Sequence, residues 1–328
     1  MRRLKICLMK NIEITNYCVS ESYEPGSTFK PVTVASALEE GVVKDGDTYV
    51  CKGFETVADY KLKCHVFSTI GSHGSLTVEQ ALMNSCNPYM IHLALEMGNS
   101  RFAYYQSLFG FGKITGIDLP GETTGIVYGD RMTTIDAACN SFGQTINVNM
   151  MQMMAAYCSI INGGMLSQPH IVKRIESANG EVVKEYKANL VRQTITASTS
   201  KLLRRYLKNT VEEGTAKKAG VTGYSVAGKT GTAQKGDRKD NKWIISFIGH
   251  APAENPKFAI YVVIDEPYGT TGTSGSSADV LTLTHNILEK LLPYMNVYKD
   301  ASDEYEDTSS SPDELTVDGI PAGTASSN

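Results

Sequence analysis

The chain lacks several patterns that would place it in a common class of protein. Its six histidines form no H-E-x-x-H motif, its seven cysteines form no C-x-x-C pair, and it has no G-x-S-x-G turn. No basic stripe is interleaved with aromatic residues, so the sequence does not support binding of nucleic acid. Near the N-terminus the apolar run covers only residues 6–9, which is too short for a signal peptide or a membrane span.

Length and composition predict one large catalytic domain followed by an acidic tail. The chain has 328 residues and is 41% hydrophobic, which is enough for a substantial core. Residues 300–328 hold eight Asp or Glu and no Lys or Arg. Removing these eight charges from the net −4 leaves +4 for residues 1–299. A mildly basic domain suits an anionic surface, and the Ser-rich acidic tail is typical of a disordered segment.

Three short motifs occur in order along the chain. Ser27 and Lys30 form S-x-x-K, Ser85 and Asn87 form S-x-N, and residues 229–231 form K-T-G. Singly, each has an ordinary explanation: a helix cap, a loop between two helices, and a strand with a close backbone approach. Together and in this order, they are the set that serine acyl-transfer enzymes of the penicillin-binding and β-lactamase type carry.

Acyl-transfer chemistry explains the residue types in the first motif. A serine hydroxyl becomes a good nucleophile when a nearby base takes its proton. If a helix begins at Ser27, Lys30 lies one turn further on the same face, so its amine can reach the Ser27 oxygen. Lys30 must then be neutral near pH 7, which burial beside a second cation, Lys229, would favour. The helix N-terminus also turns backbone N–H groups toward a developing oxyanion.

The motifs and their surroundings resemble the transpeptidase domain of a class B penicillin-binding protein. The resemblance runs from about Tyr17 to about Tyr298. Asn87 and the long stretch from there to Lys229 favour a penicillin-binding protein over a small β-lactamase. The segments that carry the resemblance are YEPGSTFKP at 23–31, SHG at 72–74, NSCNP at 84–88, SFGQ at 141–144, NGG at 162–164, EEGT at 212–215, AGKTGTAQK at 227–235, and residues 243–267.

This resemblance implies a role for each motif residue. Ser27 would attack the penultimate D-Ala carbonyl of a stem peptide, and Lys30 would take its proton. Ser85 and Lys229 would relay a proton to the departing D-Ala, while Asn87 would hold Lys30 and the substrate amide.

The K-T-G strand is implied to bind the substrate. Thr230, Gly231 and Thr232 would form the strand beside the substrate, with the two threonines holding its terminal carboxylate. The backbone N–H groups of Ser27 and Thr232 would form the oxyanion hole. The resemblance implies no cofactor and no metal.

The resemblance implies a D,D-transpeptidase that cross-links peptidoglycan stem peptides and is acylated by β-lactams. It also implies a glycosyltransferase partner and a place at the extracytoplasmic face of the bacterial membrane. Two alternatives stay open: a hydrolase of the same chemistry, either a D,D-carboxypeptidase or a β-lactamase, and an inactive penicillin-binding fragment. The hydrolase is less favoured because no Glu can be matched to a deacylating base.

The N-terminal segment departs from the family pattern. Class B proteins have an anchor and a pedestal domain before the transpeptidase domain, and the transpeptidase sheet takes two strands from the segment before S-x-x-K. We therefore expect the chain to be a fragment or a late-start product whose sheet has an unpaired edge. The expected divisions are an N-terminal remnant at 1–16, a transpeptidase domain at 17–298 and a disordered tail at 299–328.

The pattern of apolar residues and caps predicts an α+β fold, with an antiparallel sheet flanked by helices and a helical subdomain that carries the second motif. Gly41 is expected to end the first helix, and Thr77 to open the second with a capping box. The expected helices begin at Ser27 and cover 77–85, 88–97, 149–161, 196–213 and 278–292; the expected strands cover 225–234, 244–249 and 258–264.

The cysteines give weaker signals. Cys51 and Cys64 flank a predicted hairpin and could form a disulfide outside the cell. Cys86, between Ser85 and Asn87, is interpreted as a small packed residue. A zinc site is suggested by Cys64, His65 and His73, but without a C-x-x-C pair we predict no metal there.

Overall fold

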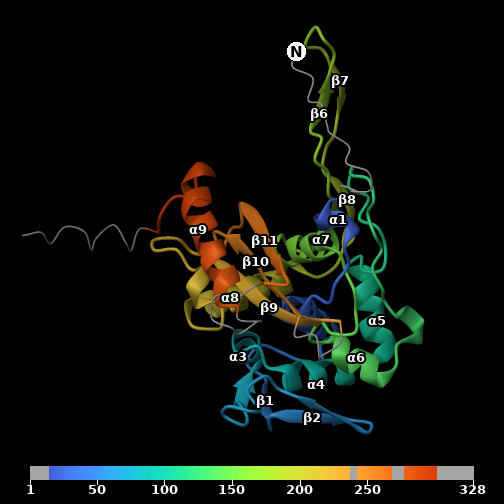
Figure 1. Cartoon of the computed structure of the whole chain (residues 1–328), viewed down its shortest axis with the longest axis vertical. Helices are drawn as coiled ribbons and strands as arrows, with labels where there is room; N and C mark the ends of the chain where they lie inside the picture. Colours follow the sequence, from blue (N-terminus) through green and yellow to red (C-terminus); the bar gives the residue numbers. More distant parts are fainter. Residues whose placement is uncertain (1–14, 237–241, 268–276, 301–328) are drawn as a thin grey trace, which may run out of the picture.

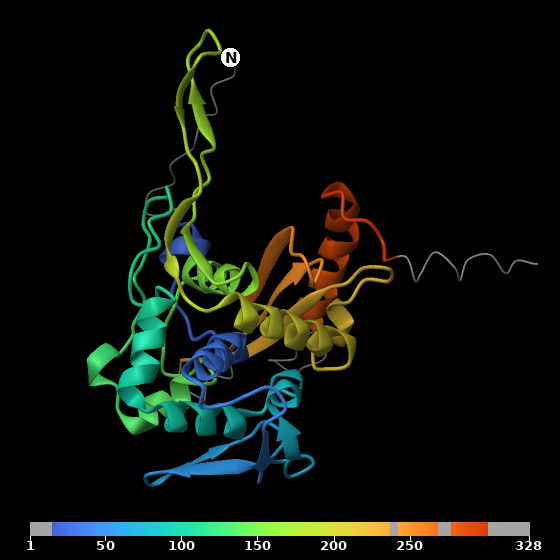
Figure 2. The same cartoon turned by 180° about the vertical axis from the view of Figure 1, so that it is seen from behind.

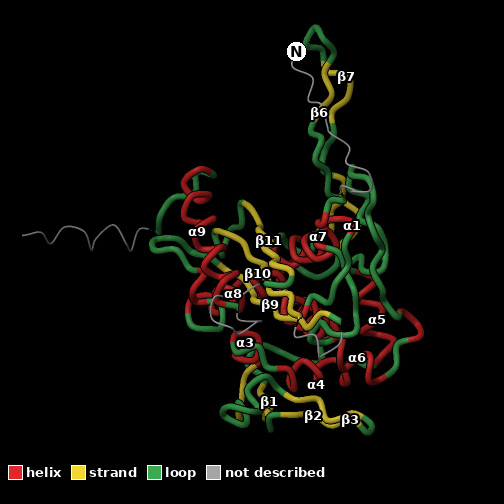
Figure 3. The backbone as a smooth tube through the Cα atoms, viewed as in Figure 1, coloured by secondary structure: helices red, strands yellow, loops and turns green. Residues whose placement is uncertain are grey.

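The computed structural model describes residues 15–236, 242–267 and 277–300. Its main sheet has three antiparallel strands in the order β11-β10-β9, with helices on both sides (Figure 1). Four two-stranded sheets, β1-β4, β2-β3, β5-β8 and β6-β7, lie around this centre, and they appear in yellow among the red helices of Figure 3. The predicted α+β fold is confirmed.

The helices are α1 (Tyr17–Ser20), α2 (Lys30–Glu40), α3 (Val78–Met83), α4 (Asn87–Met97), α5 (Asn99–Leu108), α6 (Thr134–Asn140), α7 (Met150–Ile161), α8 (Ala197–Glu212) and α9 (Ala278–Tyr294), with 3₁₀ turns η1 (Gly26–Phe29), η2 (Gly129–Arg131) and η3 (Lys217–Ala219). The strands are β1 (Thr48–Cys51), β2 (Phe54–Val57), β3 (Tyr60–Lys63), β4 (Gly74–Thr77), β5 (Met165–Gln168), β6 (Arg174–Glu176), β7 (Val182–Glu185), β8 (Asn189–Gln193), β9 (Ala227–Lys235), β10 (Lys242–Ala251) and β11 (Phe258–Asp265).

The main sheet lies between two apolar cores because its strands alternate their side chains. Phe247 of β10 belongs to the core that α9 covers, with Val280 and Leu288. The next residue, Ile248, belongs to the larger core that includes Phe29 and the helices on the other face. Among the described residues β11 pairs only with β10, so one edge of this sheet has no described neighbour.

Helix α2 runs through the larger core, which suits a helix that is apolar on most sides. Every residue from 30 to 37 is buried. The helix ends at Gly41, which has a left-handed φ of 76° and donates its N–H to the carbonyl oxygens of Ala37 and Leu38. The predicted end of this helix is therefore confirmed.

The second motif lies between two short helices of the helical subdomain. Thr77 opens α3 with the predicted capping box, and its hydroxyl accepts from the Gln80 N–H. Helix α3 ends at Met83, two residues earlier than expected, and α4 begins at Asn87 and ends before Gly98. Below α4 in Figure 1 lie β1 and the hairpin of β2 and β3, which is the hairpin predicted between Cys51 and Cys64.

The β6-β7 hairpin extends far from the body of the molecule, as the two opposite views in Figures 1 and 2 show. Its strands are exposed along their whole length, so hydrogen bonds between the two strands maintain it rather than burial. This hairpin was not predicted from the sequence, and neither were β1, β4, β5, β8, α5 and α6.

The predicted outer segments lie mostly outside the described residues, which begin at 15 and end at 300. In the described part of the chain, no helix combines the length and apolar character that a membrane span requires.

Candidate active site

Ser27 lies in the 3₁₀ turn η1, which leads directly into α2. Gly26 allows this turn to press against β9: its φ is 56°, and a Cβ there would lie 2.5 Å from the carbonyl oxygen of Thr232. The Gly26 N–H also donates to the carbonyl oxygen of Gly143 at 2.9 Å. Because only glycine permits this φ and this close approach to Thr232, Gly26 allows Ser27 to lie close to the K-T-G strand.

Lys30 is fully buried beneath Ser27 and makes three hydrogen bonds to the second motif. Its Nζ donates to the carbonyl oxygen of Ser85 at 2.6 Å, to Ser85 Oγ at 3.0 Å and to Asn87 Oδ1 at 2.6 Å. Burial lowers the pKa of Lys30 from 10.5 to about 8, against a smaller opposing effect of the nearby Cys86 and Cys64 side chains. At this pKa about a tenth of Lys30 is neutral at pH 7, and this fraction is available to accept a proton.

Ser85 occupies the centre of the site. It has a φ of 54°, the left-handed region that non-glycine residues seldom adopt. This conformation directs both its carbonyl and its hydroxyl to Lys30, while Ser85 Oγ donates to Ser27 Oγ at 3.0 Å. Strained backbone of this kind persists where surrounding contacts determine it, and it is common at functional sites.

Lys229 approaches Ser85 from the opposite side. It is fully buried on β9, and its Nζ donates to Ser85 Oγ at 3.1 Å and to the carbonyl oxygen of Thr230 at 3.2 Å. Burial, and secondarily the positive charge of Lys30, hold the pKa of Lys229 well below its ordinary value. The expected effect between the two lysines is thus found in one direction only: Lys30 lowers the pKa of Lys229, whereas burial, and not the charge of Lys229, lowers the pKa of Lys30.

The K-T-G glycine allows β9 to contact the Ser27 turn. A Cβ on Gly231 would lie 2.4 Å from Ser246 Oγ and 2.8 Å from Thr28 Cγ2, so any other residue would force the strand and the turn apart. Thr230 Oγ1, next to it, lies 3.4 Å from Thr215 Oγ1.

A cavity of about 350 Å³ opens above these groups. Ser27, Ser85, Asn87, Thr230 and Thr232 line it, while Lys30 and Lys229 are buried behind them. The cavity is also lined by residues that the sequence analysis did not assign to the site: His65, Phe142, Gln144, Thr215, Trp243 and Ser277. Four of these lie in segments that resemble the family: Phe142 and Gln144 in SFGQ, Thr215 in EEGT, and Trp243 at the start of residues 243–267. These segments were the signal by which the sequence could have indicated them.

The structure brings together all eight residues that the three motifs predicted. One relation differs from the expectation: among the described hydrogen bonds, the partner of Ser27 Oγ is Ser85 Oγ and not Lys30 Nζ. Ser85 therefore connects both lysines to Ser27. Four further residues, Cys51, Cys64, His73 and Cys86, lie close enough to hold a metal ion. The sequence had suggested Cys64 and His73 together with His65, and we predicted no metal there; the structure instead places Cys51 and Cys86 beside Cys64 and His73.

The sequence model of the penicillin-binding protein transpeptidase domain matches residues 5–289. The chain is 40% identical over 288 residues to stage V sporulation protein D of Bacillus subtilis, covering 86% of this chain and 44% of that protein. It is 32% identical over 291 residues to peptidoglycan D,D-transpeptidase FtsI of Escherichia coli K12, covering 87% and 46%. The chain thus spans about half the length of the curated relatives it matches.

The fold also matches solved structures. Penicillin-binding protein 3 of Mycobacterium tuberculosis, complexed with aztreonam, superposes with a TM-score of 0.79 at 29% identity, covering 88% of this chain and 66% of that one. The transpeptidase domain of Burkholderia pseudomallei penicillin-binding protein 3 superposes with a TM-score of 0.76 at 25% identity, covering 87% and 83%. The chain belongs to the transpeptidase domain family of the class B penicillin-binding proteins.

Proposed function

We propose that this domain is a serine D,D-transpeptidase that cross-links peptidoglycan stem peptides through an acyl-enzyme on Ser27. The observation that carries the proposal is the hydrogen-bonded set in which Ser85 Oγ joins Ser27 to two buried lysines. These groups lie at one cavity, where a carbonyl carbon can approach Ser27. The names of the relatives, among them a peptidoglycan D,D-transpeptidase, support the same reaction.

Acylation begins when Ser27 Oγ attacks the carbonyl carbon of the penultimate D-Ala. When Lys30 is neutral, its Nζ accepts from Ser85 Oγ, and Ser85 Oγ accepts from Ser27 Oγ. The Ser27 proton then moves to Ser85 Oγ as the Ser85 proton moves to Lys30, so the serine oxygen forms its new bond as an alkoxide. The tetrahedral intermediate then breaks its C–N bond, and Lys229 supplies a proton through Ser85 to the departing D-Ala amine. Asn87 holds Lys30 in position through its Oδ1.

The strand β9 binds and polarises the substrate. Thr230 and Thr232 hold the terminal carboxylate, and the backbone N–H groups of Ser27 and Thr232 stabilise the oxyanion. Gly231 keeps this strand at the distance that the Ser27 turn requires. A β-lactam presents the same carboxylate and carbonyl, acylates Ser27 and is released slowly. A similar structure is complexed with aztreonam, which supports β-lactam binding.

Transfer to an amine of a neighbouring stem peptide then releases the acyl-enzyme and completes the cross-link. Water in place of the amine would make the domain a D,D-carboxypeptidase or a β-lactamase. The third possibility, an inactive penicillin-binding fragment, is disfavoured by the complete set of motif residues around Ser27.

In the wider arrangement, residues 17–298 form the transpeptidase domain, preceded by an N-terminal segment (1–16) and followed by an acidic tail (299–328). The domain acts at the extracytoplasmic face of the bacterial membrane, beside a glycosyltransferase that makes the glycan strands. These statements rest on the family resemblance.

Covalent labelling by a fluorescent penicillin tests the proposal. Wild-type protein and a Ser107→Ala control, changed at an exposed serine, should be labelled equally, and Ser27→Ala should not be labelled. Equal labelling of Ser27→Ala would refute the assignment of the nucleophile. No labelling of folded wild-type protein would support the inactive fragment.

A second assay separates transfer from hydrolysis. The acyl-enzyme is formed from a D-Ala-D-Ala peptide and followed with and without an added D-amino acid as acceptor. A transpeptidase yields the new peptide bond in preference to the free acid. Release of the free acid alone, at any acceptor concentration, would establish the hydrolase instead.

A further inference from the structure

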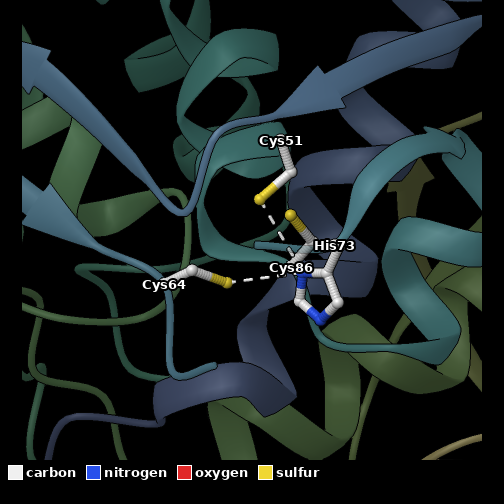
Figure 4. A group of neighbouring side chains, drawn as sticks. All are labelled: Cys51, Cys64, His73 and Cys86. Carbon is white, nitrogen blue, oxygen red and sulfur yellow. Dashed lines mark hydrogen bonds between the residues drawn. The ribbon is translucent and has the colours of Figure 1, made fainter. Parts of the chain in front are cut away.

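Four side chains from four separate segments of the chain converge at the second motif, to which Cys86 itself belongs. Cys51 ends β1, Cys64 follows β3, His73 precedes β4, and Cys86 caps α4. Their ligand atoms all lie within 4.8 Å of one another, and Figure 4 shows the three sulfurs and the His73 ring directed toward one point. None of these side chains contributes to the acyl-transfer network.

The distances fit a tetrahedral metal site. With Zn–S near 2.3 Å and Zn–N near 2.0 Å, tetrahedral ligands place sulfur and nitrogen about 3.5 Å apart and two sulfurs about 3.8 Å apart. In the structure, His73 Nδ1 lies 3.8 Å from Cys51 Sγ and 3.6 Å from Cys64 Sγ. The spacing is thus that of a coordination shell, with room for an ion between the ligands.

The ligand types and their burial identify the kind of ion. Cys51, Cys64 and Cys86 are buried and are free cysteines, and His73 is half-buried. Thiolate and imidazole ligands select Zn²⁺ over hard cations such as Mg²⁺ and Ca²⁺. Three cysteines and one histidine fill all four positions, which is typical of a structural zinc site rather than a catalytic one.

We propose that Cys51, Cys64, His73 and Cys86 bind one structural Zn²⁺ that holds the second motif in its working position. Binding displaces the three thiol protons to solvent and leaves His73 neutral, with Nδ1 as the ligand. The metal touches no reacting atom, so its role is positional.

Backbone groups around the cluster support coordinated sulfur. The Gly53 N–H donates to Cys51 Sγ at 3.4 Å. Backbone hydrogen bonds from Asn87 to Cys64 and from Tyr89 to Cys86 come from the first turn of α4. N–H donors of this kind fix the ligand orientation and are a regular part of metal sites.

The link to the active site is covalent. Cys86 stands between Ser85 and Asn87, and both of these neighbours accept hydrogen bonds from Lys30. On the other side, Cys64 is followed by His65, which lines the cavity. An ion bound by Cys86 and Cys64 therefore joins the hairpin of β2 and β3 to the strained turn at Ser85.

Metal analysis of the purified 328-residue protein tests the site without any dependence on acylation. Protein produced with added zinc should carry roughly one Zn²⁺ per chain. Cys64→Ser should lose it, while Cys158→Ser, a change at a cysteine outside the cluster, should keep it. Zinc at the same low level in wild type and Cys64→Ser would overturn the proposal. It would also be overturned if two of the three proposed cysteine ligands were found in a disulfide and the protein bound no zinc after that disulfide had been reduced.

A paired change at His73 guards against simple misfolding of the cysteine variants. His73→Cys retains four soft ligands and should keep the metal, whereas His73→Asn should lose most of it. Cobalt in place of zinc should give the visible absorption of a tetrahedral thiolate site in wild type, and a spectrum shifted by the additional thiolate in His73→Cys. Equal metal content in the two His73 variants, or a cobalt spectrum without thiolate absorption, would contradict the assignment.

Penicillin labelling of the same samples separates this inference from the proposed function. Metal-free protein should be labelled more slowly than zinc-bound protein, although Ser27 and both lysines are intact. A zinc-bound protein that is never labelled would refute the transpeptidase and leave the metal site standing.

Discussion

The turn at residues 85–87 separates two regions that are built in different ways. On one side, Ser85 and Asn87 join a set of polar groups that spans the chain from Ser27 to Lys229. On the other side, Cys86 meets three residues that all lie between 51 and 73. Successive residues of one turn thus serve two sites, so a disturbance of either region reaches the other through a single peptide segment.

The two regions also differ in how they tolerate charge. The catalytic side buries two lysines beside each other without a described salt bridge, and their pKa values fall as a result. The cysteine side gathers groups that become anions only when a cation compensates them. Burial thus lowers the pKa of Lys30, the residue that acts as the base, whereas thiol and imidazole groups gather where a metal can be held.

Removal of the buried base should have the largest effect. Lys30→Met keeps the side-chain volume but removes the proton acceptor, so the rate of penicillin acylation should fall about 10²- to 10⁴-fold. Lys208→Met, at a surface lysine paired with Glu254, is the matched control and should acylate normally. Zinc content should stay unchanged in both variants. An acylation rate within a factor of about two of wild type would remove Lys30 from the mechanism.

Loss of one of the proposed metal ligands should slow acylation less than loss of Lys30. Cys86→Ser should lose the metal and slow acylation about 10- to 100-fold, since it loosens the Ser85 turn without removing a reacting group. Cys139→Ser changes another buried cysteine and should leave both metal content and acylation rate intact. Stopped-flow acylation and metal analysis on the same samples measure the two effects together. Loss of zinc with an unchanged rate would show that the two regions are independent.

The dependence of acylation on pH should follow Lys30. Its folded pKa is lowered to about 8, so the reactive neutral form is scarce at low pH and increases as pH rises. The second-order acylation rate constant should rise about tenfold per pH unit below this value and level off above it. A rate that stays constant between about pH 6 and about pH 8 would contradict a titrating base at this position.

Relief of the backbone strain at Ser85 should have the smallest effect, and this effect is on the free energy of unfolding. Ser85→Ala and Ser85→Gly both remove the hydroxyl, but only glycine adopts a φ of 54° without steric cost. Thermal unfolding should therefore show the glycine variant to be more stable by about 1 kcal/mol. The reverse order of stability would mean that the left-handed turn carries no strain.

Much of the local structure could be predicted because its causes are local. The cap at Thr77, the stop at Gly41 and the ends of α4 follow from one or two residues and their neighbours. The sheet strands β9 to β11 were predicted from their patterns as well. The β6-β7 hairpin was missed because exposed strands carry no apolar alternation of the kind that signals a buried face.

The candidate site likewise has features that the sequence predicted and features that only the tertiary structure showed. The sequence alone determined which residues supply the chemistry, because S-x-x-K, S-x-N and K-T-G each record a short-range requirement for a nucleophile, a base or a close backbone approach. Tertiary structure decided that Ser85 stands between Ser27 and the lysines, and that Cys51, Cys64, His73 and Cys86 meet at one point. The physical reason is that packing between distant segments sets these distances, whereas sequence spacing constrains only residues within a turn or two of each other.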